Sequence, residues 1–348
     1  MLVCNKGSCF LKSVDTSQHD GPKDAEYIAA GIIAEIEANG HENIVQVVTD
    51  GASVMRAAWE IIQGKYKNIV CSWCGAHVMD LLMEDIGKLE FFGTAVKEAK
   101  QVIKFIRNHQ HTDKKFKELS HLALLLPADT RFATAFIMIQ RLLAVKESVE
   151  EVCSGTEFAA WLIGKIYIDT GKEVQKTVRD DVWWGKIAAL CEIISPCVSV
   201  MRMCDGNTPA AGKVYMAMVQ LGIKLDEALV SEDLDEFVPL SIKGTIRTML
   251  SGRWANMHSP VHGAAMCLDP EYHDVDHMVL LMARHTTIWW TWCLRHTEAA
   301  INRIWPSLSS LSTRTKKVCL PTLPSGNLRG VCPHGNGGSS GRERHLSW

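Results

Sequence analysis

One short run constrains the fold of this chain more than any other, because it predicts a strand that ends on a carboxylate. Residues 44–49 are mostly β-branched, and Asp50 and Gly51 follow directly. This composition predicts a buried strand, and the glycine predicts an abrupt turn after it. A carboxylate at the carboxyl end of such a strand lies where α/β folds bind ligands and suits a hard cation such as Mg²⁺. The alternative is that Asp50 only caps a helix that begins at Ala52.

Residues 1–110 alternate strand and helix patterns. Strands at 1–4 and 9–14 flank a turn and predict a hairpin. The rest of this region predicts helices at 24–38, 52–63, 76–87 and 91–108, with strands at 44–49 and 68–72. This order predicts an α/β fold, with a mixed sheet that has an antiparallel edge and parallel later strands.

The remaining residues separate into three parts. Residues 111–270 predict an all-helical domain, with helices at 133–145, 183–203 and 214–225 and Pro196 inside the second of these. Residues 271–306 form a separate short region. The tail at 307–348 is rich in Ser, Gly and Pro and lacks apolar periodicity, so we expect it to be disordered.

Bulk properties exclude several classes of protein. The formal net charge of −2 gives no overall attraction to nucleic acid, so a nucleic-acid surface must be local. No run of 18 apolar residues is present, and residues 1–11 do not form a secretory signal, so we expect no membrane association. Without a signal, the 12 cysteines indicate reduced thiols in an intracellular protein.

Short motifs follow one another along the chain and together carry a family resemblance. In chain order they are Thr49-Asp50-Gly51-Ala52-Ser53, Cys74-Gly75-Ala76-His77, residues 80–88, 104–109, 130–134 and 140–143, Asp205-Gly206 with Pro209, Arg253-Trp254 with His258 and His262, and Leu268-Asp269-Pro270. Over residues 9–272 this set resembles the plant branch of the hAT superfamily of DNA transposases. The resemblance is to a DUF659-like central region with a partial carboxyl-terminal dimerisation segment.

The resemblance implies an RNase H-like core, partial here at 1–110, with a large helical insertion at 111–270. In such transposases three carboxylates bind two divalent ions, usually Mg²⁺, for DNA cleavage and strand transfer. Asp50 matches the second acid. The first lies in an Asp-Gly-Trp-like motif upstream of the segment that matches 9–17, and this motif is not found. Asp15 matches another position, and Glu298 does not fit the third acid. We therefore expect a truncated, inactive copy.

Further site residues follow from the same resemblance. Cys74 and His77 lie near the active centre or the DNA end, although a buried thiol and a core histidine are the simpler alternative. Cys71, Cys74 and His77 have a zinc-like spacing, but a fourth ligand is missing and we do not expect zinc. Arg131, Arg253 and Trp254 are expected near the catalytic pocket, where arginine grips phosphate and tryptophan stacks on a base.

Partners and location also come from the resemblance. Transposon-end DNA is the expected partner and the nucleus the expected location. Residues 271–306 are expected to be a remnant of the carboxyl-terminal core and dimerisation region, and Trp289-Trp290 resembles the start of its dimerisation part, which is weakened here. Lys97, Lys100, Lys104 and Arg107 form a basic stripe that either follows a DNA backbone or is a solvated helix face.

Three functions follow from these observations. The first is a transposase-derived protein that no longer cuts DNA. The alternatives are an active Mg²⁺-dependent transposase whose gene model is truncated, and a domesticated DNA- or protein-binding factor.

Overall fold

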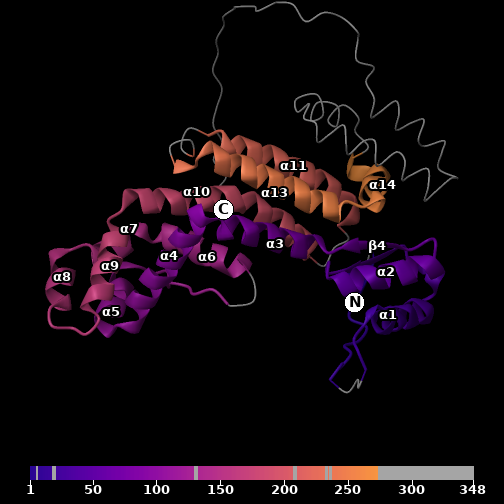
Figure 1. The fold of residues 1–348 in the computed structure, drawn as a ribbon, viewed down its shortest axis with the longest axis horizontal. Coiled ribbons are helices and arrows are strands. Elements are labelled where there is room, and N and C mark those ends of the chain that lie inside the picture. The colour runs from indigo at the N-terminus through magenta and orange to yellow at the C-terminus, as the bar shows by residue number, and fades with distance from the viewer. Residues whose placement is uncertain are drawn as a thin grey trace, which may run out of the picture.

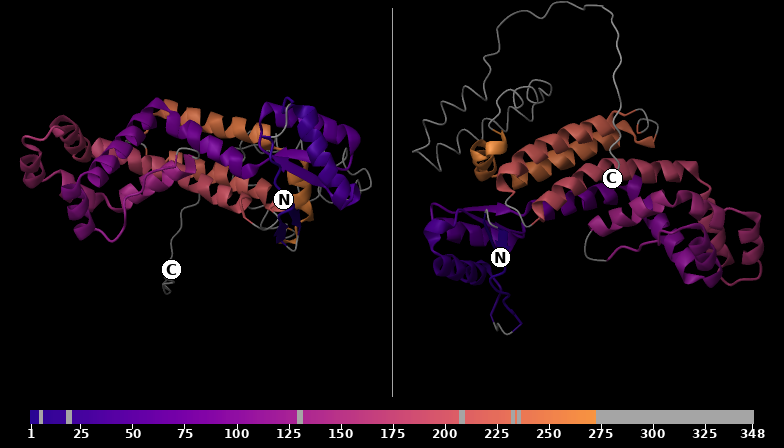
Figure 2. Two further views of the ribbon diagram at one scale, coloured as in Figure 1. Left: turned by 90° about the horizontal axis from the view of Figure 1, so that it is seen from below. Right: turned by 180° about the vertical axis from the view of Figure 1, so that it is seen from behind.

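The computed structural model describes residues 1–4, 7–17, 21–128, 132–206, 210–231, 234 and 237–272. Within these ranges the chain is mostly helical, with two small sheets of two strands each. Figure 1 and Figure 2 show a long helical body with a small α/β part at one end. The predicted α/β class therefore holds broadly, with helix predominating.

The first sheet is the predicted hairpin. Strands β1 (Leu2–Cys4) and β2 (Gly7–Cys9) pair antiparallel, with Cys4 opposite Gly7. Gly7 has a φ of 122°, a conformation that a side chain would oppose. Strand β2 ends at Cys9, whereas the prediction placed this strand at 9–14. The hairpin projects away from the rest of the molecule (Figure 1).

The second sheet is a parallel pair. Strands β3 (Gln46–Thr49) and β4 (Val70–Trp73) pair in register, and α2 (Ser53–Lys65) makes the crossover between them. In the described ranges the two sheets are separate, so they do not form one mixed sheet. The RNase H-like arrangement stays a prediction.

The prediction that 44–49 is a buried strand is wrong. Val45 and Val48 are 57% and 53% exposed, whereas Val47 packs against a hydrophobic cluster. Strand β3 has one described neighbour, β4, so the backbone groups of alternate residues face away from the ladder. Hydrophobic composition identified the strand, but it could not reveal that the strand lies at an edge.

Helix α1 (Ala25–Asn39) has clear signals at both ends. The Asp24 side chain accepts a hydrogen bond from the Tyr27 amide at 3.0 Å, which satisfies one of the free amides at the start of the helix. Gly40, with a φ of 80°, ends it as predicted.

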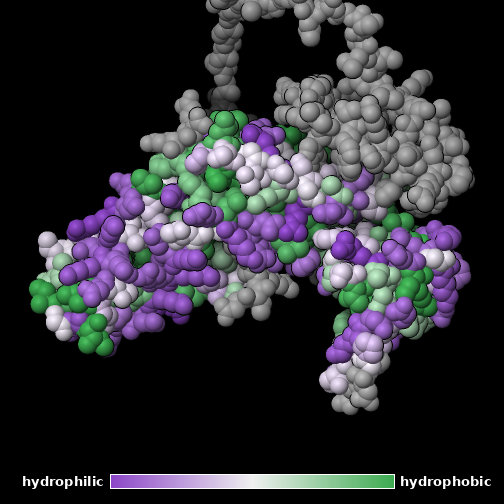
Figure 3. All heavy atoms as spheres, viewed as in Figure 1, coloured by the Kyte–Doolittle hydropathy of each residue, from purple (hydrophilic) through white to green (hydrophobic). Residues whose placement is uncertain are grey.

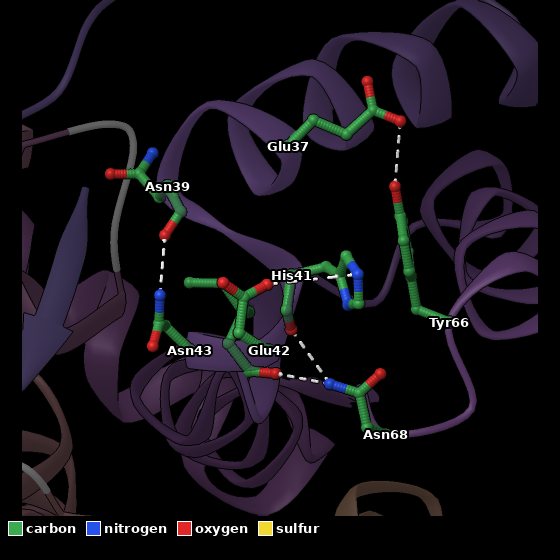
Figure 4. A network of polar contacts seen from close by, with 8 residues as sticks. Glu37, Asn39, His41, Glu42, Asn43, Tyr66 and Asn68 are labelled. Carbon is green, nitrogen blue, oxygen red and sulfur yellow. Dashed lines mark hydrogen bonds and ion pairs between the residues drawn. The ribbon is translucent and has the colours of Figure 1, made fainter.

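A polar network joins the loops at the amino ends of β3 and β4 (Figure 4). The Tyr66 hydroxyl donates to Glu37 at 2.9 Å, and the Asn68 amide donates to the carbonyls of His41 (2.9 Å) and Ile44 (3.2 Å). Lys65 pairs with the same Glu37, and its hydrogen bond holds the pKa of that carboxyl below its usual value. The network fixes α1 and the 3-10 helix η1 (His41–Asn43) beside the parallel strands.

The helical body follows β4 without interruption by a strand in the described residues. Its elements are α3 (Gly75–Lys88), α4 (Glu90–Asn108), α5 (Gln110–Leu119), α6 (Phe132–Ala144), α7 (Lys146–Cys153), α8 (Thr156–Leu162), α9 (Ile168–Val178), α10 (Asp181–Cys204), α11 (Ala211–Leu229), α13 (Leu240–Met257), α14 (Pro260–Leu268) and the 3-10 helix η2 (Pro270–Tyr272). The helices predicted at 76–87, 91–108, 133–145, 183–203 and 214–225 are confirmed, with small shifts at their ends.

The buried side chains form two separate clusters. The smaller one joins α1, α2 and β4 and includes Ile36, Ile62 and Ile69. The larger one begins with Val78 on α3 and runs through the helical body to Met266 on α14. The buried side chains therefore divide at the junction of β4 and α3, whereas the predicted domain boundary near residue 110 stays a prediction. The predicted regions at 271–306 and 307–348 lie outside the described residues, apart from 271 and 272.

Helix α10 is long and apolar enough, by length and composition alone, to cross a membrane. This is weak evidence, because Trp183, Leu190 and Ile194 on this helix are buried in the larger cluster. Pro196 lies inside α10 without ending it. Core packing accounts for the apolar character of the helix.

Substitution of Leu82 by alanine should destabilise the helical body. Leu82 lies on α3 with no exposed surface, so its truncation removes buried methyl groups and leaves a cavity. We expect a loss of about 2–5 kcal/mol in the free energy of unfolding, measured by urea denaturation. Leu240→Ala, at a position 79% exposed, is the control and should change it by less than about 0.5 kcal/mol. Equal losses in the two variants would contradict the assignment of α3 to the core.

Candidate functional site at the carboxyl edge of the parallel strands

The parallel strands place Asp50 and Cys74 next to each other. Asp50 follows β3 directly and Cys74 follows β4 directly. The Cys74 amide donates a hydrogen bond to the Thr49 carbonyl at 2.7 Å, which continues the ladder by one step. Both residues therefore lie at the carboxyl edge of the pair, and α2 and α3 begin beside them. This is the edge where parallel sheets bind ligands.

The Asp50 carboxylate is exposed and lightly held. Its Oδ1 atom accepts a hydrogen bond from the Ala52 amide at 3.1 Å, which shapes the turn into α2. No side chain in the described ranges donates to Oδ2. The carboxylate thus takes part in the local turn but does not cap α2, whose N-cap residue is Ala52 and which has no side-chain capping hydrogen bond, and it keeps one oxygen free for a ligand.

Aromatic and cationic groups surround the turn at Asp50. The Trp59 indole donates to the Thr49 hydroxyl at 3.0 Å, and the Arg56 guanidinium lies 5.9 Å from the centre of the Trp73 ring. Gly51 lies so close to that ring that an added Cβ would be 2.4 Å from it. Sequence reasoning missed Arg56, although its position in the second turn of a helix that starts beside Asp50 was a usable signal. The cation–π contact holds the Arg56 guanidinium over the Trp73 ring, which also contacts Gly51.

Cys74 and His77 form the start of α3. Cys74 is the residue before the helix and His77 is in its first turn, and both are partly buried. Cys204, at the end of α10, lies against the same turn, because an added Cβ at Gly75 would be 2.7 Å from its Sγ. Burial, with the Cys74 thiol nearby, raises the pKa of Cys204 to about 12, so it stays a neutral thiol.

Metal ligands are sparse in the described part of the chain. No group of three or more His, Cys, Asp or Glu side chains that could hold a metal ion is present there. Burial raises the pKa of Cys71 to about 11, which disfavours the thiolate that zinc requires. The predictions about Mg²⁺ and zinc stay predictions.

Arg253 lies at the other end of α3. Its Nε and Nη2 atoms donate to one oxygen of Asp85 at 2.9 and 2.5 Å, and both side chains are partly buried. Asp85 follows Cys74 by eleven residues, which is about 16 Å along the helix. The structure therefore does not bring Arg253 to the Asp50 edge, and its charge ties α13 to α3.

Trp254 points into the core. The side chain is 1% exposed, and its ring lies 5.8 Å from Tyr215 and 4.9 Å from His258, with both pairs edge-on. His262 stacks at 6.3 Å. In this conformation the indole ring cannot stack on a base. The role of Trp254 near DNA stays a prediction that would require α13 to rearrange.

Four residues named by the sequence lie outside the described residues. These are Arg131, Glu298 and the Trp289-Trp290 pair. Their expected roles stay predictions.

Substitution of Gly51 by alanine should disturb the site. The new methyl group would meet the Trp73 ring, so we expect a loss of about 1–3 kcal/mol in stability together with a change in tryptophan fluorescence. Gly64→Ala on α2 is the matched control, because an added Cβ there has nothing within 4 Å. That variant should be neutral or stabilised by up to about 1 kcal/mol. If the two variants behaved alike, the close contact between Gly51 and Trp73 would be refuted.

His262 should make stability depend on pH. Its Nδ1 accepts a hydrogen bond from the Ser259 amide at 3.2 Å, and burial lowers its pKa to about 4. The unfolded chain has an ordinary histidine pKa of about 6.5, so between these values it binds more protons than the folded chain. Stability should therefore fall by about 2 kcal/mol as pH is lowered from 7 to 5. Urea denaturation at each pH measures this loss.

His262→Gln keeps an acceptor for the Ser259 amide and should remove most of this pH dependence. His121→Gln, at an exposed position, should retain it. A full pH dependence in the His262 variant would show that another group is responsible.

The comparisons with known proteins concern the same end of the chain. Residues 1–102 match the family model described as a domain of unknown function (DUF659), a family found in hAT-like transposase-related proteins. The matched segment contains Asp50, Cys74 and His77 and ends within α4. No curated protein matches the chain. The match thus supports an hAT-type transposase-related origin.

Proposed function

We propose that this chain is an hAT transposase-derived protein that holds DNA and no longer cuts it. In this proposal the α/β part is a partial RNase H-like unit, and the helical body is the insertion that such transposases carry. The protein acts by contact with DNA, not by phosphodiester chemistry.

One observation carries the proposal. Asp50 lies at the carboxyl edge of two parallel strands, beside Cys74, inside the segment that matches DUF659. An RNase H-like site places an acid at such an edge. Together with the DUF659 match, this position supports descent from a DNA-cutting enzyme, because the carboxyl edge of parallel strands is where α/β folds bind their ligands.

The donor set around Asp50 does not fit a pair of Mg²⁺ ions. Mg²⁺ requires near-octahedral oxygen ligands, and a two-metal site is a clamp built from several carboxylates. Within the described ranges Asp50 belongs to no group of three possible ligands, and one of its oxygens accepts the Ala52 amide. The residues described at this edge therefore do not fit a two-metal cleavage site.

Further parts of the proposal follow from the family. Nuclear location and transposon-end DNA as the partner belong to a protein of transposase origin. We also propose a homodimer through residues 271–306, in which dimerisation is weakened because this region is short.

The test compares binding and cutting in one preparation of the full chain. Supercoiled plasmid with Mg²⁺ or Mn²⁺ measures nicking, and retardation of a labelled duplex measures binding. We expect binding without nicking, because one carboxylate cannot activate a nucleophile and stabilise the leaving oxygen. Asp50→Asn should leave both measurements unchanged.

Asp15→Asn is the matched control. Asp15 is also an exposed turn aspartate, and its Oδ1 accepts the Ser17 amide at 2.8 Å, as Asp50 accepts that of Ala52. Nicking by the wild type that Asp50→Asn abolishes and Asp15→Asn preserves would replace this proposal with an active enzyme. Absence of both binding and nicking would favour a protein-binding role.

A further inference from the structure

Helix α4 exposes a stripe of four cations. Lys97, Lys100, Lys104 and Arg107 recur at spacings of three and four residues, so 3.6 residues per turn places them within about a quarter of the helix circumference. The opposite side of α4 is buried and carries Phe92, Ala99, Ile103 and Ile106. Hydrophilic side chains cover much of the viewed surface of the helical body (Figure 3). We call these four residues the α4 stripe.

The α4 stripe is not neutralised by its own helix. Lysines on other helices have an acid four residues away, as in Lys88 with Glu84 (2.6 Å), Lys117 with Asp113 (2.5 Å) and Lys146 with Glu150 (3.6 Å). In the described ranges none of the stripe residues makes an ion pair. Their neighbours at three and four residues are apolar, neutral or also basic.

Such an arrangement works against the stability of the helix. Like charges three or four residues apart destabilise a helix by about 0.2–0.5 kcal/mol for each pair. The stripe contains such contacts from Lys97 to Lys100, from Lys100 to Lys104 and from Lys104 to Arg107. A solvated face without a ligand gains nothing from this repulsion, whereas a bound polyanion relieves it.

The acids closest to the stripe have other interactions. Glu98 has its pKa raised by burial and lies near Lys186, Asp180 and Lys176, away from the stripe. Glu173 on α9 accepts a hydrogen bond from Gln101 at 3.1 Å. Glu173 keeps its negative charge, but the four cations of the stripe outnumber it, so this surface has a local excess of positive charge although the whole chain has a formal net charge of −2.

We propose that the α4 stripe binds the phosphate backbone of duplex DNA without reading its sequence. This inference rests on the proposed function, and it names the surface that holds the DNA. The stripe is about 15 Å long, and duplex DNA carries roughly one negative charge for each 1.7 Å of its axis. A row of four cations fits phosphates, because contacts to phosphates position a protein on DNA without reading its sequence.

The dependence of the affinity on salt concentration provides a quantitative test of the proposal. Four phosphate contacts predict a slope of about −3.6 for the logarithm of affinity against the logarithm of salt concentration. The stripe's share of the affinity should then fall roughly a hundred-fold between 50 and 200 mM salt. Fluorescence anisotropy of a labelled random-sequence duplex, titrated with the full chain, measures both quantities.

The test variant replaces all four stripe residues by glutamine. The control replaces Lys23, Lys67, Lys165 and Lys224 by glutamine. These lysines are exposed and far apart in the sequence, and their replacement changes the net charge by the same amount. We expect the stripe variant to lose most of its affinity and its salt slope to approach zero, while the control stays within about two-fold of the wild type. Equal circular dichroism spectra establish that both variants are folded.

Each of the other outcomes would contradict the inference, and each would point to a different explanation. Full binding by the stripe variant would place the DNA surface elsewhere and leave the proposed function standing. Equal losses of affinity in the two variants would show that the effect comes from net charge and not from the stripe. If polyglutamate competed as well as unlabelled duplex, the stripe would bind acidic protein instead. If the wild type did not bind the duplex, both this inference and the DNA binding in the proposed function would be contradicted.

Discussion

The passage from β4 into α3 is the constraint on which the rest of the structure depends. Strand β4 ends at Trp73, α3 begins at Gly75, and the Cys74 amide between them donates to the Thr49 carbonyl at 2.7 Å. Five side chains of α3 are completely buried, namely Val78, Met79, Leu82, Met83 and Ile86. Because so short a connection allows little freedom, packing of α3 also fixes the orientation of the parallel strands and of the edge that carries Asp50.

Asp50 has a local and an ancestral explanation, and the structure accommodates both. The carboxylate bonds the Ala52 amide, which is enough to stabilise the turn. Its position beside Cys74 at the edge of a parallel pair is not required by that turn. In the proposed function Asp50 persists because of this bond, since replacing the aspartate would leave the Ala52 amide unpaired.

Helix α4 illustrates how one element serves both packing and binding. Its buried side contributes eight side chains to the larger cluster, whereas its other side carries cations that form no ion pair with the residues that the structure describes. Position along the chain also matters, since α4 joins the segment that matches DUF659 to the rest of the helical body. A surface on this helix is therefore held rigidly, as phosphate binding in register requires.

The sequence by itself determined the order of strands and helices up to residue 108 and the presence of α6, α10 and α11, because apolar periodicity, Asp24 and Gly40 act locally. The family resemblance placed Cys74 and His77 near the active centre to which it assigned Asp50. Only the tertiary structure decided that Val45 and Val48 are exposed, that Trp254 is buried, and that Arg253 bonds Asp85 across 168 residues of sequence. Contacts between distant segments decide burial and pairing, and no local pattern records which segment will be the neighbour.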